Sequence, residues 1–327
     1  MLKLTAKDIR GVVSMHPTPS KPNAGDWRET NSVDLDTSKK LWDLMLKGGI
    51  AGFALCGTTG ECAGLLWDEK KEYISTAVET IKKRAYTFAG ATSLGTKETI
   101  RQMREFQKMG ADGAFVGLPL WQTPTMENMV QFYADLGDAV PDFPVMIYSN
   151  SMFFKTMFPV EFWAGIGKKA MTVITNKISY PMDHLEEDVK VATDRVQFIP
   201  GKAGSFVAFK KVGTKVRGLW TTDPSPEPYV AISNAIQKND LEAMDLLQQE
   251  FNALPKRNPT EGPGFQVEFP SYNAQIEREG WNAGTFLKVG PMRPPYRDLP
   301  DYWVRSIGIY EHAFEQLRKK YIGIKPV

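Results

Sequence analysis

The sequence has few of the residues that build metal centres and disulfide frameworks. Among its 327 residues there are only two cysteines and three histidines. Cys56 and Cys62 lie on either side of a Gly/Thr-rich turn, and a chain of this size needs no disulfide to fold, so we expect two free thiols. The histidines are spread along the whole chain without the paired spacing of zinc ligands. We therefore expect no metal site.

The chain also lacks long apolar runs and an excess of charge of either sign. No segment approaches the roughly 20 apolar residues that a membrane helix needs, and residues 1–11 contain no apolar signal-peptide core. The 40 Lys and Arg nearly balance the 38 Asp and Glu, which gives no electrostatic reason to expect nucleic acid or a membrane as a partner. We expect a soluble, cytoplasmic protein that acts on a small molecule.

What the sequence does contain is an alternation of short β-branched runs with amphipathic stretches long enough for helices. The runs are residues 9–14, 52–55, 86–90, 113–117, 145–148, 173–177, 196–200 and 218–221. Such alternation predicts βα units and a parallel sheet. About eight units, without a GxGxxG motif after the first run, favour a closed (β/α)8 (TIM) barrel over an open Rossmann sheet.

After the eighth run the pattern changes to helices with Pro/Gly-rich joints. The predicted helices are residues 240–253, 271–283 and 301–320. We expect residues 1–237 to form the barrel and residues 238–327 to form a helical extension packed on it. The longest irregular stretch, residues 17–31, follows the first run, where barrel loops tend to carry function.

Active sites of (β/α)8 barrels are built at the carboxyl ends of the strands, so polar residues there are the first candidates. The second run is followed by Gly57-Thr58-Thr59-Gly60-Glu61, which either holds a small anion such as a carboxylate or is simply a turn and helix cap. Tyr148 ends the fifth run and is either a structural or a functional phenol. Trp220, in the eighth run, either packs against the extension or stacks on a substrate ring.

Two lysines are candidates for a reactive amine. Lys177 ends the sixth run and would project into the apolar barrel end, where desolvation lowers a lysine pKa and leaves a neutral amine that can form a Schiff base with a ketone. The alternative is a lysine that extends to solvent. Lys202 follows the seventh run with glycines on both sides, which indicates an exposed turn or a phosphate-type loop, so it ranks second.

Taken in chain order, these motifs are more informative than any one of them. The motif at residues 57–61, Ala89-Gly90-Ala91-Thr92, Gly110-Ala111-Asp112-Gly113, Tyr148 and Lys177 resemble the dihydrodipicolinate synthase and N-acetylneuraminate lyase superfamily of pyruvate-dependent class I aldolases. The resemblance extends from about residue 9 to residue 284. It implies a homotetramer and a reaction that needs no metal or other cofactor.

The same resemblance assigns roles to individual residues. It implies that Lys177 forms a Schiff base with C2 of a pyruvyl group, that Tyr148 transfers protons, and that Thr58 and Thr59 hold the pyruvate carboxylate. Ser179, two residues after the lysine, is a further candidate for substrate binding. A protonated imine accepts the electron pair of a breaking C–C bond, which is why such aldolases use a lysine.

Departures from the synthase pattern concern the aldehyde side of the substrate. Dihydrodipicolinate synthases carry an arginine five residues after the tyrosine, and this sequence has Phe153 there. The tyrosine that those synthases share across a subunit interface is missing from Pro119-Leu120-Trp121. We expect Trp121, Phe153, Phe154 and Trp220 to line the aldehyde side with aromatic surface, which suits a flat aryl group.

Together with residues 17–31 and 290–296, these aromatic residues resemble one branch, the hydratase-aldolases that cleave benzylidenepyruvates during bacterial degradation of polycyclic aromatic hydrocarbons. In that branch a tryptophan and an asparagine mark the activity, and the matching residues are Trp220 and Asn273, with Asn282 as the alternative asparagine. The implied substrate is an aryl pyruvate whose ring substituent, hydroxyl or carboxylate, stays open. Two other functions also stay open: a synthase or sugar-acid lyase with a polar aldehyde pocket, and a barrel that binds pyruvate without turnover.

Overall fold

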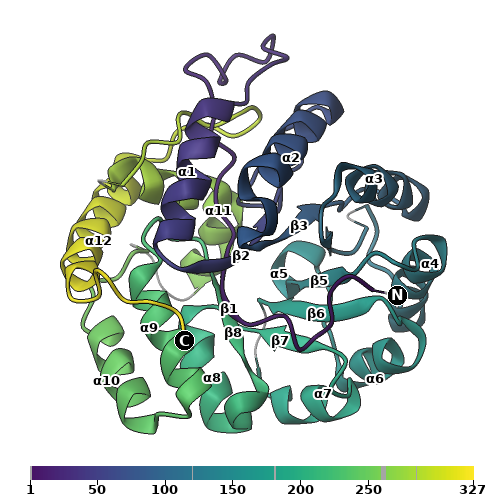
Figure 1. The fold of residues 1–327 in the computed structure, drawn as a ribbon. Helices are drawn as coiled ribbons and strands as arrows, with labels where there is room; N and C mark the ends of the chain where they lie inside the picture. The colour runs from purple at the N-terminus through teal and green to yellow at the C-terminus, as the bar shows by residue number, and fades with distance from the viewer. Residues whose placement is uncertain (1, 120, 180–181, 259–262, 285) are drawn as a thin grey trace.

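The structure, a computed structural model, describes residues 2–119, 121–179, 182–258, 263–284 and 286–327. Its eight strands are β1 (Gly11–Ser14), β2 (Ile50–Leu55), β3 (Tyr86–Gly90), β4 (Gly113–Val116), β5 (Val145–Ser149), β6 (Val173–Ile178), β7 (Gln197–Ile199) and β8 (Gly218–Thr221). They form one sheet in the order β7-β6-β5-β4-β3-β2-β1-β8, and every paired neighbour is parallel. A parallel bridge between Gly201 and Trp220 brings the two outer strands together. The prediction of a (β/α)8 barrel is confirmed (Figure 1).

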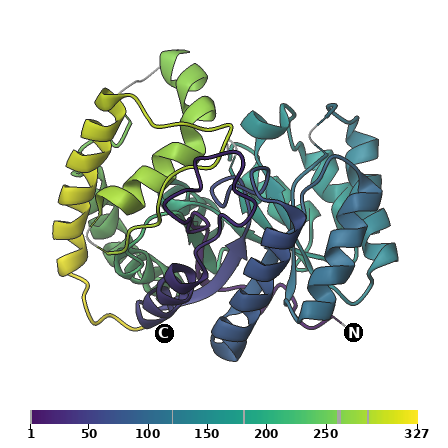
Figure 2. The same ribbon diagram turned by 90° about the horizontal axis from the view of Figure 1, so that it is seen from above.

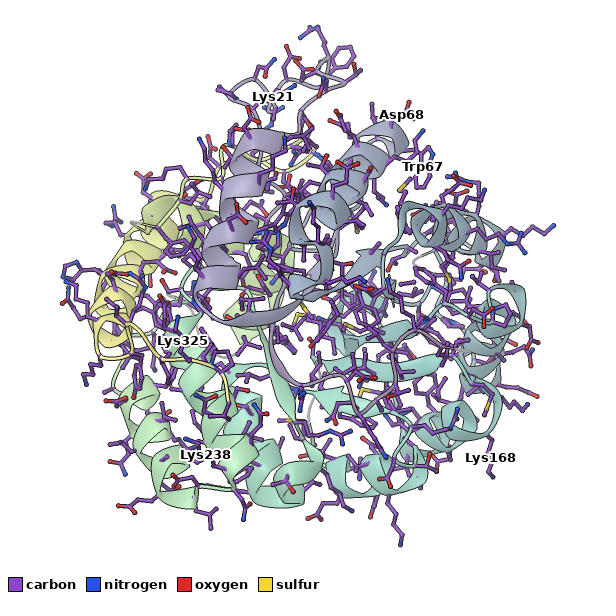
Figure 3. The ribbon with its side chains drawn as sticks, in the orientation of Figure 1. Lys21, Trp67, Asp68, Lys168, Lys238 and Lys325 are labelled. Carbon is purple, nitrogen blue, oxygen red and sulfur yellow. The ribbon has the colours of Figure 1, made fainter. Side chains whose placement is uncertain are left out.

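Helices surround the sheet, as expected for βα units (Figure 1). They are α1 (Leu35–Lys47), α2 (Trp67–Ile81), α3 (Thr96–Met109), α4 (Met126–Ala139), the short α5 (Ser151–Phe154), α6 (Val160–Lys169), α7 (Leu185–Val191), α8 (Lys202–Val212) and α9 (Glu227–Lys238). Helix α3 illustrates why they form: it buries Thr99, Gln102, Met103 and Phe106 along one face, and Gly110 ends it with a φ of 94°. Charged residues such as Asp68, Lys168 and Lys238 point outward (Figure 3).

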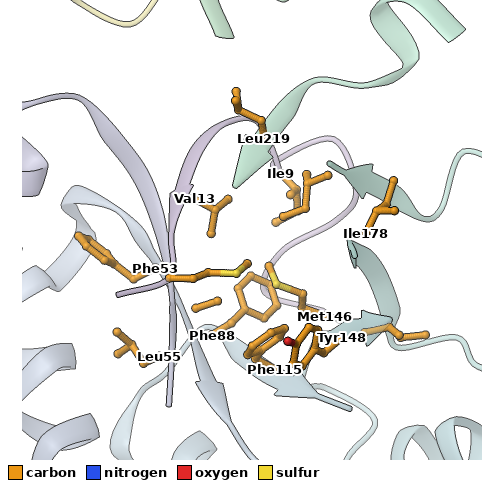
Figure 4. Packing of buried hydrophobic residues seen from close by; sticks show 14 of the residues in the cluster. Ile9, Val13, Phe53, Leu55, Phe88, Phe115, Met146, Tyr148, Ile178 and Leu219 are labelled. Carbon is orange, nitrogen blue, oxygen red and sulfur yellow. The ribbon is translucent and has the colours of Figure 1, made fainter. Parts of the chain in front are cut away.

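Large apolar side chains fill the inside of the barrel. Val13, Phe88, Phe115 and Met146 come from four different strands, and each is at most 2% exposed. Figure 4 shows these four side chains converging inside the barrel, with Tyr148 beside Phe115, whereas Phe53 points away from them and packs against His16. The interior is thus a packed core, and the space for a ligand lies beyond it, at the ends of the strands.

The extension consists of α10 (Leu241–Asn252), α11 (Pro263–Ala283) and α12 (Asp301–Lys319). Helix α11 begins eight residues before the predicted start at residue 271. Helix α12 packs against α11 on the outside of the molecule (Figure 2). Phe251, Trp281 and Phe314 of the extension belong to the same buried apolar cluster as the barrel residues. The division at residues 237 and 238 stays a prediction.

Both ends of the chain lie on one side of the barrel (Figure 2). Lys3 forms an ion pair with Asp112, which precedes β4, and Pro326 lies next to Gly49, which precedes β2. The termini are therefore at the amino ends of the strands, opposite to the end where a barrel site is expected. Within the described residues, no helix has the length and apolar character needed to cross a membrane.

Candidate active site

A cavity of about 520 Å³ opens at the carboxyl ends of β5 to β8, against α11. Seven of the eight predicted site residues line it: Thr59, Tyr148, Phe153, Lys177, Ser179, Trp220 and Asn273. The eighth, Thr58, lines a small recess that also touches Thr59, Tyr148 and Lys177. Residues far apart in the sequence thus meet in one place, because parallel strands present their carboxyl ends at the same end of the barrel.

Lys177 is buried at the end of β6, with 7% of its surface exposed. Its Nζ donates a hydrogen bond of 3.0 Å to Ser179 Oγ and lies 4.2 Å from the ring centre of Tyr148 and 4.0 Å from that of Trp220. Burial lowers the pKa of Lys177 to about 7, although the negative charge of Glu277 opposes the shift. A large fraction of the amine is therefore neutral near neutral pH and able to attack a carbonyl carbon.

Tyr148 faces Lys177 because the two residues are register partners on β5 and β6. Its hydroxyl lies 3.4 Å from Thr58 Oγ1 and 3.3 Å from Asn150 Nδ2. Burial raises the pKa of Tyr148 to about 12. The resting phenol therefore carries its proton and is suited to donate it, and it becomes a base only when a cation such as an iminium forms beside it.

The turn after β2 needs its glycines. A Cβ on Gly60 would lie 2.9 Å from the backbone of Cys56, and one on Gly57 would lie 2.8 Å from the Phe115 ring. Among the described residues, the backbone amides of Thr58 and Thr59 donate to no protein acceptor. This compact turn therefore presents amides and hydroxyls to the recess, which is what a carboxylate requires.

Glu61 fixes the turn to the extension. Its carboxylate is fully buried and pairs with Arg278 of α11 and with Arg293 of the following segment. Both guanidinium groups also donate to the carbonyl oxygen of Thr18, at 2.7 and 3.0 Å. We call these three residues, Glu61, Arg278 and Arg293, the Glu61 clamp. They join the turn to the start of the predicted irregular stretch, but the residues of that stretch line none of the cavities described here.

Replacing Glu61 with alanine should destabilise the protein by about 3–5 kcal/mol, because two buried guanidinium groups lose their counter-charge. The measurement is the free energy of unfolding in urea. Glu98→Ala is the matched control, since Glu98 pairs with Arg101 on the exposed face of α3, and such pairs contribute about 0–1 kcal/mol. Equal losses in the two variants would contradict a structural role for the clamp.

Of the four predicted aromatic residues on the aldehyde side, the structure places two there. Phe153 and Trp220 line the cavity, and Trp220 is held by a 3.0 Å hydrogen bond from its Nε1 to Ile178 O. Phe154 was wrongly assigned: it is buried beneath the site, edge-on to the Tyr148 ring. Trp121 was also wrongly assigned, because it is 81% exposed and does not line the cavity. Leu120 lies outside the described residues.

The predicted environment of Lys202 was wrong. It opens α8 and is covered by the extension, where its Nζ donates a 2.7 Å hydrogen bond to Tyr310 of α12. The site therefore has a second, half-buried lysine, whose pKa is also lowered by desolvation. The two amines differ in their partners: Lys202 is bound to the phenol of α12, and Lys177 to a serine inside the cavity.

The two candidate asparagines are also separated by the structure. Asn273 lines the cavity. Asn282 lies two turns further along α11 and does not line it; its side chain binds Gly290 O and the backbone N–H of Val289, both at 2.9 Å. Several lining residues were missed by the sequence analysis, among them Asn150, Met182 and Glu277. Glu277 could have been found, because its position four residues after Asn273 puts both on one helix face.

Comparison with known proteins agrees with the fold. A family model and hydratase-aldolase relatives identify the chain as an enzyme of the lyase class. The Dihydrodipicolinate synthetase family matches residues 24–298, and the chain belongs to this family.

Individual relatives match over nearly the whole chain. The chain is 35% identical to a trans-O-hydroxybenzylidenepyruvate hydratase-aldolase of Pseudomonas putida, over 98% of this chain and 97% of the relative. It is 27% identical to a trans-2'-carboxybenzalpyruvate hydratase-aldolase of Nocardioides sp., over 98% and 97%. Among solved structures, PhdJ bound to a substrate intermediate has a TM-score of 0.90 at 30% identity, over 98% of this chain and 100% of that one.

Proposed function

We propose that the protein is a hydratase-aldolase of polycyclic aromatic hydrocarbon degradation that cleaves an aryl-substituted α,β-unsaturated 2-oxo acid into an aromatic aldehyde and pyruvate. The observation that carries the proposal is the buried amine of Lys177, which lies between the phenol of Tyr148 and the indole of Trp220. The relatives with hydratase-aldolase activity support it. The substrate carboxylate would bind at Thr58 and Thr59.

In this mechanism the neutral amine of Lys177 attacks C2 of the substrate, and loss of water gives a protonated imine. Ser179, at 3.0 Å from Nζ, would position the amine for this attack. Conjugation with the imine makes C4 electrophilic, so that water can add there. The aryl group would lie between Phe153 and Trp220, whose apolar surfaces suit a flat ring.

Cleavage then runs as a retro-aldol reaction. Tyr148 takes the proton of the new C4 hydroxyl, the C3–C4 bond breaks, and its electron pair moves into the imine to give an enamine. The aromatic aldehyde leaves, C3 regains a proton, and hydrolysis of the imine releases pyruvate and Lys177. Asn273 would hold the C4 oxygen during these steps.

The test is turnover of trans-o-hydroxybenzylidenepyruvate and trans-2'-carboxybenzalpyruvate, followed by the absorbance of the aldehyde and by a coupled assay for pyruvate. Turnover of either acid supports the proposal, and the better substrate identifies the ring substituent. Turnover only of aliphatic or polyol 2-oxo acids would replace the proposal with a synthase or sugar-acid lyase. A pyruvate adduct without any turnover would indicate a binding barrel.

The proposal includes a homotetrameric enzyme in the cytoplasm. Support for an oligomer comes from large apolar residues exposed on the loops that follow the neighbouring strands β3 and β4, with Leu94 67% and Trp121 81% exposed. Patches of this kind mark interaction surfaces. Light scattering after size-exclusion chromatography measures the oligomeric state, and a monomer at micromolar concentration would contradict this part of the proposal.

A further inference from the structure

Glu277 is the one carboxylate among the described residues that line the catalytic cavity. It is 7% exposed and lies on α11, one turn after Asn273. Its Oε2 accepts a 2.9 Å hydrogen bond from Arg257, and no described residue donates a hydrogen bond to Oε1. One oxygen is therefore held in place, and the other is available to a ligand or water in the cavity.

Arg257 is itself held on several sides. In addition to Glu277 it lies 3.3 Å from Asp223 and 3.3 Å from Glu311. These contacts come from the loop after β8 and from α12, so they fix the guanidinium between the barrel and the extension. The position of the Glu277 carboxylate is thus set by a guanidinium that has three carboxylate partners. A general base has to be positioned in this way, because its reach is about one hydrogen bond.

A second cavity of about 240 Å³ adjoins the first. The two cavities share Lys202, Trp220, Thr222 and Glu277 as wall residues. Charged and polar groups, including Asp223, Arg257 and Tyr310, line the second cavity, and its volume has room for several water molecules at about 30 Å³ each. Glu277 therefore lies between the catalytic cavity and the polar second cavity.

The proposed reaction needs a base at the hydration step that the residues assigned so far supply poorly. Tyr148 is assigned to the C4 hydroxyl in the cleavage step, and its own hydroxyl lies close to Thr58 and Asn150. Asn273 can orient a water but cannot take its proton. The Glu277 carboxylate, which also lines the polar second cavity, can both orient a water molecule and accept its proton.

We propose that Glu277 is the general base that activates the water added at C4. This inference rests on the proposed function. The water oxygen bonds to C4 and gives one proton to Glu277. The π electron pair of the C3=C4 bond then forms a C2=C3 double bond, and the π electron pair of the imine moves to its nitrogen. Glu277 then returns the proton, through water, to C3, which restores the imine. The net reaction is the addition of one water molecule across the C3=C4 double bond.

The experiment separates hydration from cleavage by using two substrates. Wild-type enzyme and Glu277→Gln are assayed with trans-o-hydroxybenzylidenepyruvate or trans-2'-carboxybenzalpyruvate, which need water addition, and with the corresponding 4-hydroxy-4-aryl-2-oxobutanoate, which does not. In the variant, kcat for the unsaturated acid should fall by about 10²–10⁴-fold, the usual contribution of a general base. Cleavage of the hydroxy acid should fall by less than about tenfold.

Glu279→Gln is the matched control, because Glu279 lies on α11 two residues after Glu277 but lines neither cavity. It makes the same change from a carboxylate to an amide outside the site, and both activities should persist. Borohydride trapping of pyruvate by Glu277→Gln checks that its site is intact.

Three results would overturn the inference. Equal losses with the two substrates would assign Glu277 a structural or cleavage role, and unchanged hydration would assign it no catalytic role. Wild-type enzyme that turns over neither substrate would instead remove the proposed function, which is a different outcome from a defect confined to the variant.

Discussion

Lys177→Ala should neither release aldehyde from an aryl pyruvate nor form a borohydride-stable adduct with pyruvate. The reason is that the variant lacks the amine that forms the imine. Without the imine, C4 is not electrophilic enough to add water, and the C3–C4 bond is not weakened for cleavage. Peptide mass spectrometry after reduction measures the adduct directly. Lys202→Ala is the matched control, because it removes the other lysine that lines the same cavity and should keep the adduct on Lys177. An adduct that disappears with Lys202 instead would move the reactive amine to α8.

The pH dependence of this adduct follows from burial. The reactive form is the neutral amine, so trapping should increase as the pH rises through the pKa of Lys177. Because burial lowers that pKa to about 7, the rate should reach half its maximum near pH 7, and not near the ordinary lysine value of 10.5. A midpoint near pH 10 would mean that the ammonium is solvated.

Tyr148→Phe should keep the pyruvate adduct but release aldehyde about 10²–10⁴-fold more slowly, the usual cost of losing a proton-transfer group. Phenylalanine preserves the ring contacts with Phe115 and Phe154 and removes only the hydroxyl that meets Thr58 and Asn150. Single-turnover kinetics with the hydroxylated substrate isolates the cleavage step.

Tyr133→Phe serves as the control for Tyr148→Phe. Tyr133 is equally buried, but its hydroxyl donates to Val116 O behind the barrel wall, and its loss should leave kcat within a few-fold of wild type. Comparable losses in the two variants would show that removing a buried hydroxyl slows the enzyme through stability. An unchanged rate in Tyr148→Phe would assign the proton transfer to another group.

The barrel and its reactive end could be predicted because both follow from local patterns. Each strand is a short β-branched run, and Tyr148 and Lys177 were found from their positions at the ends of two such runs. The directions of loop side chains could not be predicted in this way. Trp121 lies in the loop after β4 and Phe154 at the end of the short helix α5 after β5, yet one is exposed and the other buried, because the geometry of such connections depends on distant contacts.

Buried charges were the other part that sequence patterns missed. Glu277 and Arg257 are charged residues in the C-terminal extension, and such residues usually mark a solvated face. Glu277 is buried and the Arg257 side chain is only 14% exposed, because the two pair with each other and Arg257 also pairs with Asp223 and Glu311, from the loop after β8 and from α12. Glu61 was noticed as part of its motif, but its arginine partners lie more than 200 residues away in the chain.

The Glu61 clamp connects two groups of site residues that come from different parts of the fold. The strand ends hold the groups that would bind pyruvate and form the imine, whereas α11 carries Asn273 and Glu277, which line the same cavity. The clamp joins the two sets directly, because Glu61 lies two residues after Thr59 and Arg278 follows Glu277 on α11. Substitutions of the α11 residues that line the cavity would change the part of the substrate that is recognised there, while Lys177 and its strand neighbours stay the same. A new substrate specificity can then arise from substitutions in the C-terminal extension, while the residues at the ends of the strands that form the imine are unchanged.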